Sequence, residues 1–185
     1  MARTSSRSRH DLQIIPNPHL SVINVLGSVP GMIGRYAQSE EQLLLGILRH
    51  NRLIDIFTGS MCYSLESPAR TFMPGIGEVE TSEICLGISM TGKQFVFPIQ
   101  ARGPKDPIGT IQVEQDLAVC ASKFPTLICR PIGAQLVEDD LIALFEFILS
   151  DREVSIKDER HYRLVRDEDL YDEETTSRTS SRDET

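Results

Sequence analysis

Three polar side chains near the middle of the chain have the types and spacing to bind a metal ion and a phosphate. Glu83 opens one strand-like run, and Gln100 and Arg102 close the next, with Ala101 between them. A carboxylate and an amide carbonyl are oxygen ligands that Mg²⁺ accepts, and the backbone carbonyl of Ala101 can supply a third oxygen. Arg102 adds a positive charge that can clamp a phosphate. The set suits phosphodiester hydrolysis with Mg²⁺, or with Mn²⁺ in its place.

A hairpin is expected to position these side chains. The runs 83–88 and 94–101 are joined by a short connection around Gly92, which predicts an antiparallel pair. With Gly92 at the turn centre, Glu83 lies opposite Gln100. Because side chains alternate along a strand, one face is apolar and the other is polar. The polar face carries Glu83, Gln100 and Arg102.

Two alternatives stay open at this point. The polar face could be the ordinary solvent-facing side of a hairpin, without chemistry. Glu78 or Glu80, which lie a few residues before Glu83, could also supply the acid of this strand instead.

Periodicity predicts the elements around the hairpin. Ser39 and Gln42 have the form of a capping box, which predicts a helix over 40–51. Apolar residues at helical spacing predict a second helix over 108–124, which Pro125 ends. The other expected elements are a strand with a bend over 53–65, a strand buried on both faces over 127–129, a strand rather than a helix over 141–148, and a last hairpin from 154–156 and 162–165.

The length and composition predict one folded domain with a tail at each end. The chain has 185 residues, 40% hydrophobic and 25% charged, with a net charge of −8, and the eight acids and three arginines of 166–185 supply −5 of it. We expect a disordered basic, Ser-rich tail over 1–12, an irregular wrapping segment over 13–38, a domain over 39–165 and a disordered acidic tail over 166–185.

The sequence also indicates the cellular compartment of the protein and the redox state of its cysteines. No apolar run is long enough to span a membrane, and no signal-type segment follows the first residues, so a cytoplasmic protein is expected. The four cysteines have neither zinc-site spacing nor a neighbouring histidine, which predicts reduced thiols. No small-molecule cofactor is indicated.

The predicted order of helix, three strands, helix and strand resembles the αβββαβ core of the PD-(D/E)XK, or restriction-endonuclease-like, phosphodiesterases. That family places an acid on the second strand, and an acid or glutamine, one spacer and a lysine at the end of the third. Glu83, Gln100 and Ala101 match this pattern, and Arg102 stands at the lysine position. The segment after Phe95 is also similar to a bacterial family of candidate endonucleases that carries Gln-Ala-Lys-Gly here.

The resemblance implies an α/β fold with a mixed central sheet flanked by helices, Mg²⁺ bound by Glu83, Gln100 and Ala101, and DNA as substrate. Glu41, or Glu40, would be the acid that many members contribute from the first helix. Because arginine is never deprotonated in proteins, Arg102 could not accept a proton from water. Residues that could contact nucleic acid are Lys105, Gln112, Gln115, Lys123 and Arg130.

These observations lead to a metal-dependent DNA endonuclease of restriction or repair type, with a homodimer as a possible assembly. The runner-up is a catalytically inactive protein of the same fold that binds nucleic acid or a protein partner. It is motivated by Arg102 and by the acidic charge. A third reading is an interaction protein whose acidic tail mimics nucleic acid.

Overall fold

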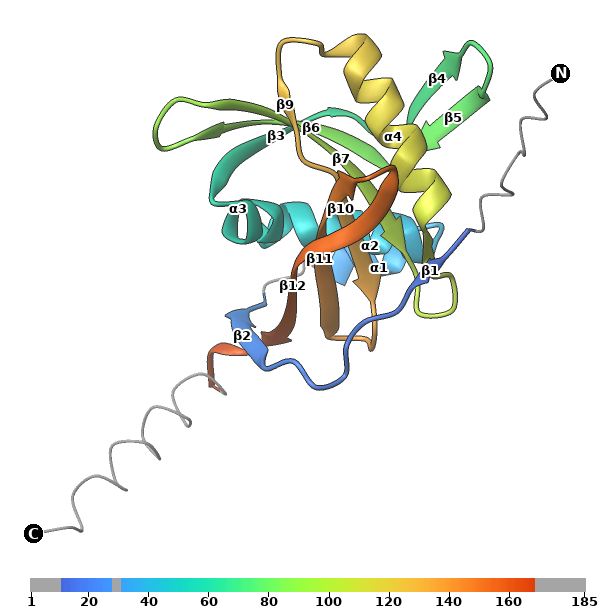
Figure 1. Cartoon of the computed structure of the whole chain (residues 1–185). Helices are drawn as coiled ribbons and strands as arrows, with labels where there is room; N and C mark the ends of the chain where they lie inside the picture. Colours follow the sequence, from blue (N-terminus) through green and yellow to red (C-terminus); the bar gives the residue numbers. More distant parts are fainter. Residues whose placement is uncertain (1–10, 28–30, 169–185) are drawn as a thin grey trace, which may run out of the picture.

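The computed structural model describes residues 11–27 and 31–168. Over these ranges the strands form an eight-stranded central sheet, in the order β2-β12-β11-β10-β7-β6-β3 with β9 added beside β7 (Figure 1). The pairs β7–β10, β7–β9 and β2–β12 are parallel and the other pairs are antiparallel. The predicted α/β class with a mixed central sheet is confirmed. Of the tails predicted over 1–12 and 166–185, residues 1–10 and 169–185 lie outside the described residues.

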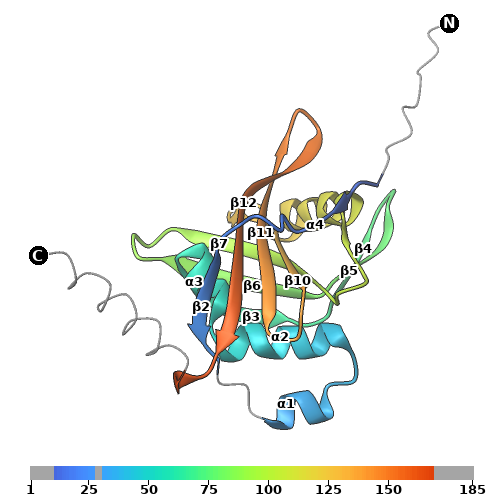
Figure 2. The ribbon, with the colours of Figure 1, turned by 90° about the horizontal axis from the view of Figure 1, so that it is seen from below.

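The strands of the central sheet differ widely in length. The longest are the two that form the protruding hairpin in Figure 2. Their bounds are β2 Val22–Leu26, β3 Ser60–Glu66, β6 Glu83–Ser89, β7 Gln94–Arg102, β9 Ile128–Cys129, β10 Ile132–Leu136, β11 Leu141–Ser150 and β12 Glu153–Val165.

Helices cover both faces of this sheet (Figure 2). On one side lie α1 (Gly31–Tyr36), α2 (Glu40–His50) and α3 (Leu53–Thr58), and on the other side lies α4 (Thr110–Lys123). Leu44 and Leu48 of α2 pack with Phe97 and Ile99 of β7 in the largest apolar cluster. On the opposite face, Cys120 of α4 packs with Val96 of the same strand. The alternation along β7 thus divides the core into two layers, each of which buries one face of the sheet.

The first predicted helix is confirmed, and its start is fixed by its cap. The hydroxyl of Ser39 accepts a hydrogen bond from the backbone N–H of Gln42 at 3.1 Å. The Gln42 side chain reaches back to the N–H of Gln38, one residue before the expected partner. The predicted helix over 108–124 is confirmed as α4, and the predicted strand over 141–148 is confirmed as β11.

Three predicted elements differ from the structure. The segment 53–65 is not one bent strand, because its first half forms α3, which Gly59 ends in the left-handed conformation before β3 begins. The segment 127–129 is not buried on both faces, since Ile128 is exposed. The last hairpin does not form within 154–165, which is the single strand β12 paired with β11.

Two smaller sheets flank the central one. A hairpin of β4 (Ala69–Met73) and β5 (Gly77–Thr81) is inserted between β3 and β6. Near the N-terminus, β1 (Gln13–Ile14) pairs with β8 (Ile108–Gly109) just before α4. Among the described helices, none has the length and apolar character needed to cross a membrane.

Candidate functional site

The end of β7 holds a half-buried arginine surrounded by oxygen atoms. The Arg102 side chain is 13% exposed, and its guanidinium donates to the Gln100 side-chain carbonyl at 2.9 Å and to the Ala101 backbone carbonyl at 3.0 Å. It also donates to the Ser82 hydroxyl at 3.4 Å. Two carboxylates complete the ring, Asp106 at 3.4 Å and Glu41 at 4.0 Å. The structure therefore gathers four of the predicted residues, Glu41, Gln100, Ala101 and Arg102, at one point.

The first turn of α2 brings Glu41 to this point. The Ser39 cap starts the helix next to the end of β7, and Gly103 makes that approach possible. A Cβ on Gly103 would overlap the carboxylate of Glu40. Glu40 therefore occupies the space beside Gly103, and Glu41, one residue later, faces Arg102.

A buried network behind Gln100 sets the direction of its amide. Its Nε2 donates to Asp116 of α4 at 2.8 Å, which leaves its carbonyl oxygen to face Arg102. Asp116 also accepts a hydrogen bond from the Thr81 hydroxyl at 2.5 Å. Burial raises the pKa of Asp116 to about 6, and the hydrogen bonds from Thr81 and Gln100 and the charge of Arg102 oppose that rise. The bond from Thr81 fixes the Asp116 carboxylate, and the carboxylate in turn holds the Gln100 amide in one orientation.

The register prediction for the hairpin is wrong by one residue. Glu83 lies opposite Ile99 rather than Gln100, so it points to the face that α2 covers. There its carboxylate accepts a hydrogen bond from Nε of Arg49 at 2.9 Å. Gln100 points to the opposite face, toward α4. The structure therefore does not bring Glu83 together with Gln100 and Arg102.

Ser82 takes the place beside Arg102 that was predicted for an acid. It lies between β5 and β6, and its hydroxyl accepts from the backbone N–H of Ala101 at 3.1 Å. A hydroxyl brings no negative charge to the site. The rival acid Glu80 pairs with Arg70 at 2.7 Å, and Glu78 lies on the exposed side of β5. No strand carboxylate therefore reaches the Arg102 guanidinium within the described contacts.

These residues do not fit a Mg²⁺ ion alongside Arg102. The guanidinium already uses the oxygens of Gln100 and Ala101, which are two of the three predicted ligands, and Glu83, the third, lies on the other face. Within residues 11–27 and 31–168, no group of three or more His, Cys, Asp or Glu side chains could hold a metal ion. We therefore derive no chemical step through a metal from this arrangement.

A polar cleft of about 580 Å³ opens next to the Arg102 ring. Glu41 and Ser82, both partners of Arg102, line it, as do Arg49 and Arg70. The side chain of Arg49 is 46% exposed and that of Arg70 is 63% exposed. The cleft thus offers two solvent-accessible guanidinium groups beside two hydroxyl-bearing residues, Ser67 and Ser82.

The predicted nucleic-acid contacts do not form one basic patch. Arg130 is packed against the rings of Phe95 and Phe97 and bonded to Glu146 at 2.8 Å, so it supports the sheet. Lys123, at the end of α4, pairs with Glu66 at 3.2 Å. Arg130 and Lys105 lie near opposite ends of β7, about 20 Å apart along the strand.

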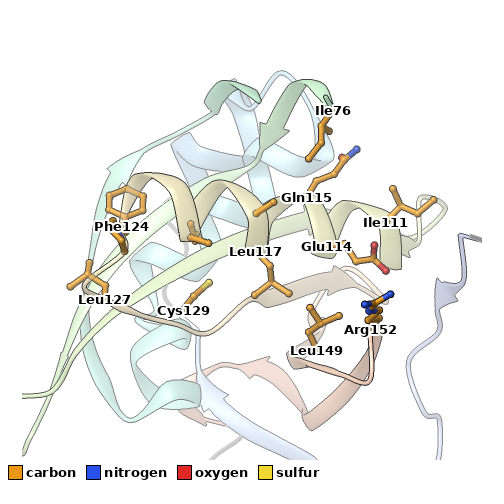
Figure 3. Close-up of a pocket in the computed structure, with 14 residues that line it drawn as sticks. Ile76, Ile111, Glu114, Gln115, Leu117, Phe124, Leu127, Cys129, Leu149 and Arg152 are labelled. Atoms are coloured by element: carbon orange, nitrogen blue, oxygen red, sulfur yellow. The ribbon is translucent and has the colours of Figure 1, made fainter. Parts of the chain in front are cut away.

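A second hollow, about 890 Å³ and mainly apolar, runs along α4 (Figure 3). Leu117 of α4 and Phe124, the residue after the last turn of that helix, line it together with Leu149 near the tip of the β11–β12 hairpin. The predicted contact residue Gln115 lies at this groove, and Gln112 is half-buried on the same helix. The groove is separate from the ring around Arg102.

Sequence reasoning missed Asp116, Ser82, Arg49 and Arg70. A signal existed for Asp116, because it falls between Val113 and Cys120 on the buried face of α4. A carboxylate at such a position needs polar partners, which indicates a buried network.

The chain was compared with known proteins at three levels. No family model matches it, and no curated protein and no solved structure matches it either.

Proposed function

We propose that this chain is a nucleic-acid-binding protein on a restriction-endonuclease-like scaffold, in which phosphodiester groups of DNA enter the cleft beside Arg102. One observation carries the proposal. Glu41, Gln100 and Arg102, the residues that correspond to a phosphodiesterase site, meet in one cluster, and two members of that cluster, Glu41 and the Arg102 partner Ser82, line a cleft. The same cleft presents the exposed Arg49 and Arg70. Arginine is well suited to phosphate, since its planar fork matches two phosphate oxygens.

The order of elements supports the scaffold. Along the chain, α2, β3, β6, β7, α4 and β10 give helix, three strands, helix and strand, and β10 returns parallel to β7. The β4–β5 hairpin is an insertion in this order, and it forms one wall of the cleft through Arg70 and Glu80. This arrangement agrees with the proposed αβββαβ core.

Binding without cleavage is favoured by the state of Arg102. Its charge is matched by Glu41 and Asp106, and its donors hold the oxygens that a metal would need. Arg70, which is exposed, differs from Arg102 in how many of its N–H donors are in use. The described contacts of Arg70 use only its Nε, in a pair with Glu80, so further N–H donors face the cleft.

A metal-dependent DNA endonuclease is the second candidate function. A specific observation favours it, namely that oxygens of Glu41, Gln100 and Ala101 converge from α2 and β7 on one positive group. This candidate function requires that the protein cleave DNA only when Mg²⁺ or Mn²⁺ is present. A homodimer on palindromic DNA is the assembly that would go with it.

The two candidates are separated by binding and nicking assays on the same preparation. Fluorescence anisotropy with a labelled duplex and a labelled single strand, in chelator and at several salt concentrations, should show salt-dependent binding. Arg70→Gln should weaken it and reduce the salt slope by about 1. Arg163→Gln is the matched control, because Arg163 is also exposed and paired with acids, Glu138 and Asp140, but does not line the cleft.

Supercoiled plasmid is incubated with the wild-type protein and Mg²⁺ or Mn²⁺ in parallel. Unchanged plasmid together with binding in chelator supports the first candidate. Metal-dependent nicking supports the second, and cleavage that continues in chelator contradicts both. Equal loss of binding in Arg70→Gln and Arg163→Gln would show that the cleft is not the binding site.

A further inference from the structure

Five oxygens surround the Arg102 guanidinium, and all are of types that a hard divalent cation accepts as ligands. Two are carboxylate oxygens, from Glu41 and Asp106, and three are neutral, from Gln100, Ala101 and Ser82. Carboxylates, amide and backbone carbonyls, and hydroxyl or water oxygens are the ligands that Ca²⁺ and Mg²⁺ use in proteins. They come from α2, the β5–β6 junction, β7 and the loop after it, so the folded chain assembles them.

We infer that the Arg102 guanidinium is a built-in substitute for the divalent cation of this site. Its presence closes the wild-type site to metal, and its removal opens an oxygen cage that binds one. The inference concerns the same site as the proposed function, but it does not depend on nucleic-acid binding.

Burial and charge carry this inference. The Arg102 side chain is 13% exposed, and its guanidinium contacts all five oxygens, so it occupies the space between them. A second cation placed within its ring would meet the guanidinium charge at short range in a partly desolvated place, where repulsion is strong. If the guanidinium is removed, the two carboxylates are left without their counter-charge and the buried carbonyl of Gln100 without its donor. The two carboxylates are partly solvated, at 36% exposure for Glu41 and 74% for Asp106, so they contribute negative charge, whereas the unpartnered carbonyl of the buried Gln100 carries the cost; a cation in the cage meets both.

The orientation of Gln100 makes the cage specific for a cation. Asp116 holds Nε2 of Gln100, so the amide presents its carbonyl oxygen, and not its NH₂ group, to the cage even when Arg102 is replaced. The Ala101 carbonyl is fixed by the β7 backbone. The cage therefore keeps at least two directed oxygens that do not depend on Arg102 for their position.

The test measures Mn²⁺ binding by electron paramagnetic resonance, which counts free Mn²⁺. Wild type should show no stoichiometric site. Arg102→Ala should bind one Mn²⁺ per chain, with an affinity at least about tenfold higher than any wild-type binding, in the range of other all-oxygen sites. Arg70→Ala is the matched control, because it also removes an arginine near the cleft, yet Arg70 touches none of the cage oxygens among its described contacts. Arg70→Ala should gain no site.

A second variant protects the test against loss of the fold. Arg102→Met keeps an apolar stem and removes the guanidinium with its charge and its N–H donors, and Mn²⁺ should raise its melting temperature while leaving that of wild type unchanged. Adding Glu41→Gln to either variant should weaken the new site. The inference is overturned if wild type binds one Mn²⁺ that Glu41→Gln removes, or if folded Arg102→Ala or Arg102→Met binds none. DNA binding in chelator is scored separately, so either proposal can fail alone.

Discussion

Replacement of Asp116 by asparagine should make the protein more stable at neutral pH, which is unusual for a buried, doubly hydrogen-bonded side chain. Burial raises the pKa of this carboxyl from 3.8 to about 6, so the folded protein holds the proton more tightly than the unfolded chain. Between these two pKa values the native state binds more protons, and stability therefore falls as pH rises. At neutral pH the ionised Asp116 costs about 3 kcal/mol relative to a neutral side chain.

Asparagine can keep both contacts without that charge. Its Oδ1 can accept from Nε2 of Gln100, and its Nδ2 can donate to the Thr81 hydroxyl, so Gln100 keeps its orientation. At pH 8 we expect the free energy of unfolding of Asp116→Asn to exceed that of wild type by up to about 3 kcal/mol, or about 6 to 12 °C in melting temperature for a chain of this size. At pH 4 the difference should largely vanish.

Urea unfolding followed by circular dichroism from pH 4 to pH 8 measures this difference, and the comparison between two variants cancels the titration of the other groups. Asp106→Asn is the control, because Asp106 also pairs with Arg102 but is 74% exposed. It should change little. A variant Asp116→Asn that is less stable than wild type at pH 8, or whose difference does not depend on pH, would refute the reasoning about burial.

Three further changes test the other assignments. Glu83→Ala should lower the free energy of unfolding by about 2 kcal/mol, because it removes a buried carboxylate bonded to Arg49. Unchanged stability with lost nicking would return Glu83 to the active site. Arg102→Lys should increase plasmid nicking with Mg²⁺, because the smaller ammonium releases oxygens that the guanidinium now binds. A tenfold gain corresponds to a barrier lower by about 1.4 kcal/mol, and no gain counts against the metal-dependent endonuclease. Arg130→Ala should cost about 2 kcal/mol in urea unfolding, because it removes the hydrogen bonds to Glu146, which keeps its pair with Lys157. Lost DNA affinity at unchanged stability would contradict that structural role.

The pairing of the central hairpin could be predicted from the sequence, but its register could not. Alternation of apolar side chains predicts the strands on both sides of Gly92, and β6 and β7 confirm them. The register depends on the turn between the two strands. A hydrogen bond from the Ser89 N–H to the Lys93 carbonyl closes this turn, and it lies one residue away from the expected position. Since the side-chain period is two, this slip moves Glu83 to the opposite face.

The short helix α3 could not be predicted for a different reason. Its sequence, Leu53–Thr58, is rich in β-branched and aromatic residues, which favour a strand locally. Leu53, Ile54 and Phe57 are all buried in the cluster beneath α2, so tertiary packing decides the conformation. By contrast, the capped helix α2 was predictable, because the signal at Ser39 is local.

The network around Gln100 connects these observations into one physical account of the site. A buried ionised carboxylate such as Asp116 lowers stability, and packing alone would be better served by a neutral side chain. Its effect is directional, because it holds the Gln100 amide so that an oxygen, and not an N–H, faces the end of β7. An oriented oxygen suits a hydrogen-bond donor or a cation placed at that point. In this chain the group at that point is the guanidinium of Arg102, and the network of Asp116 and Gln100 fixes it beside the cleft that Glu41 and Ser82 line.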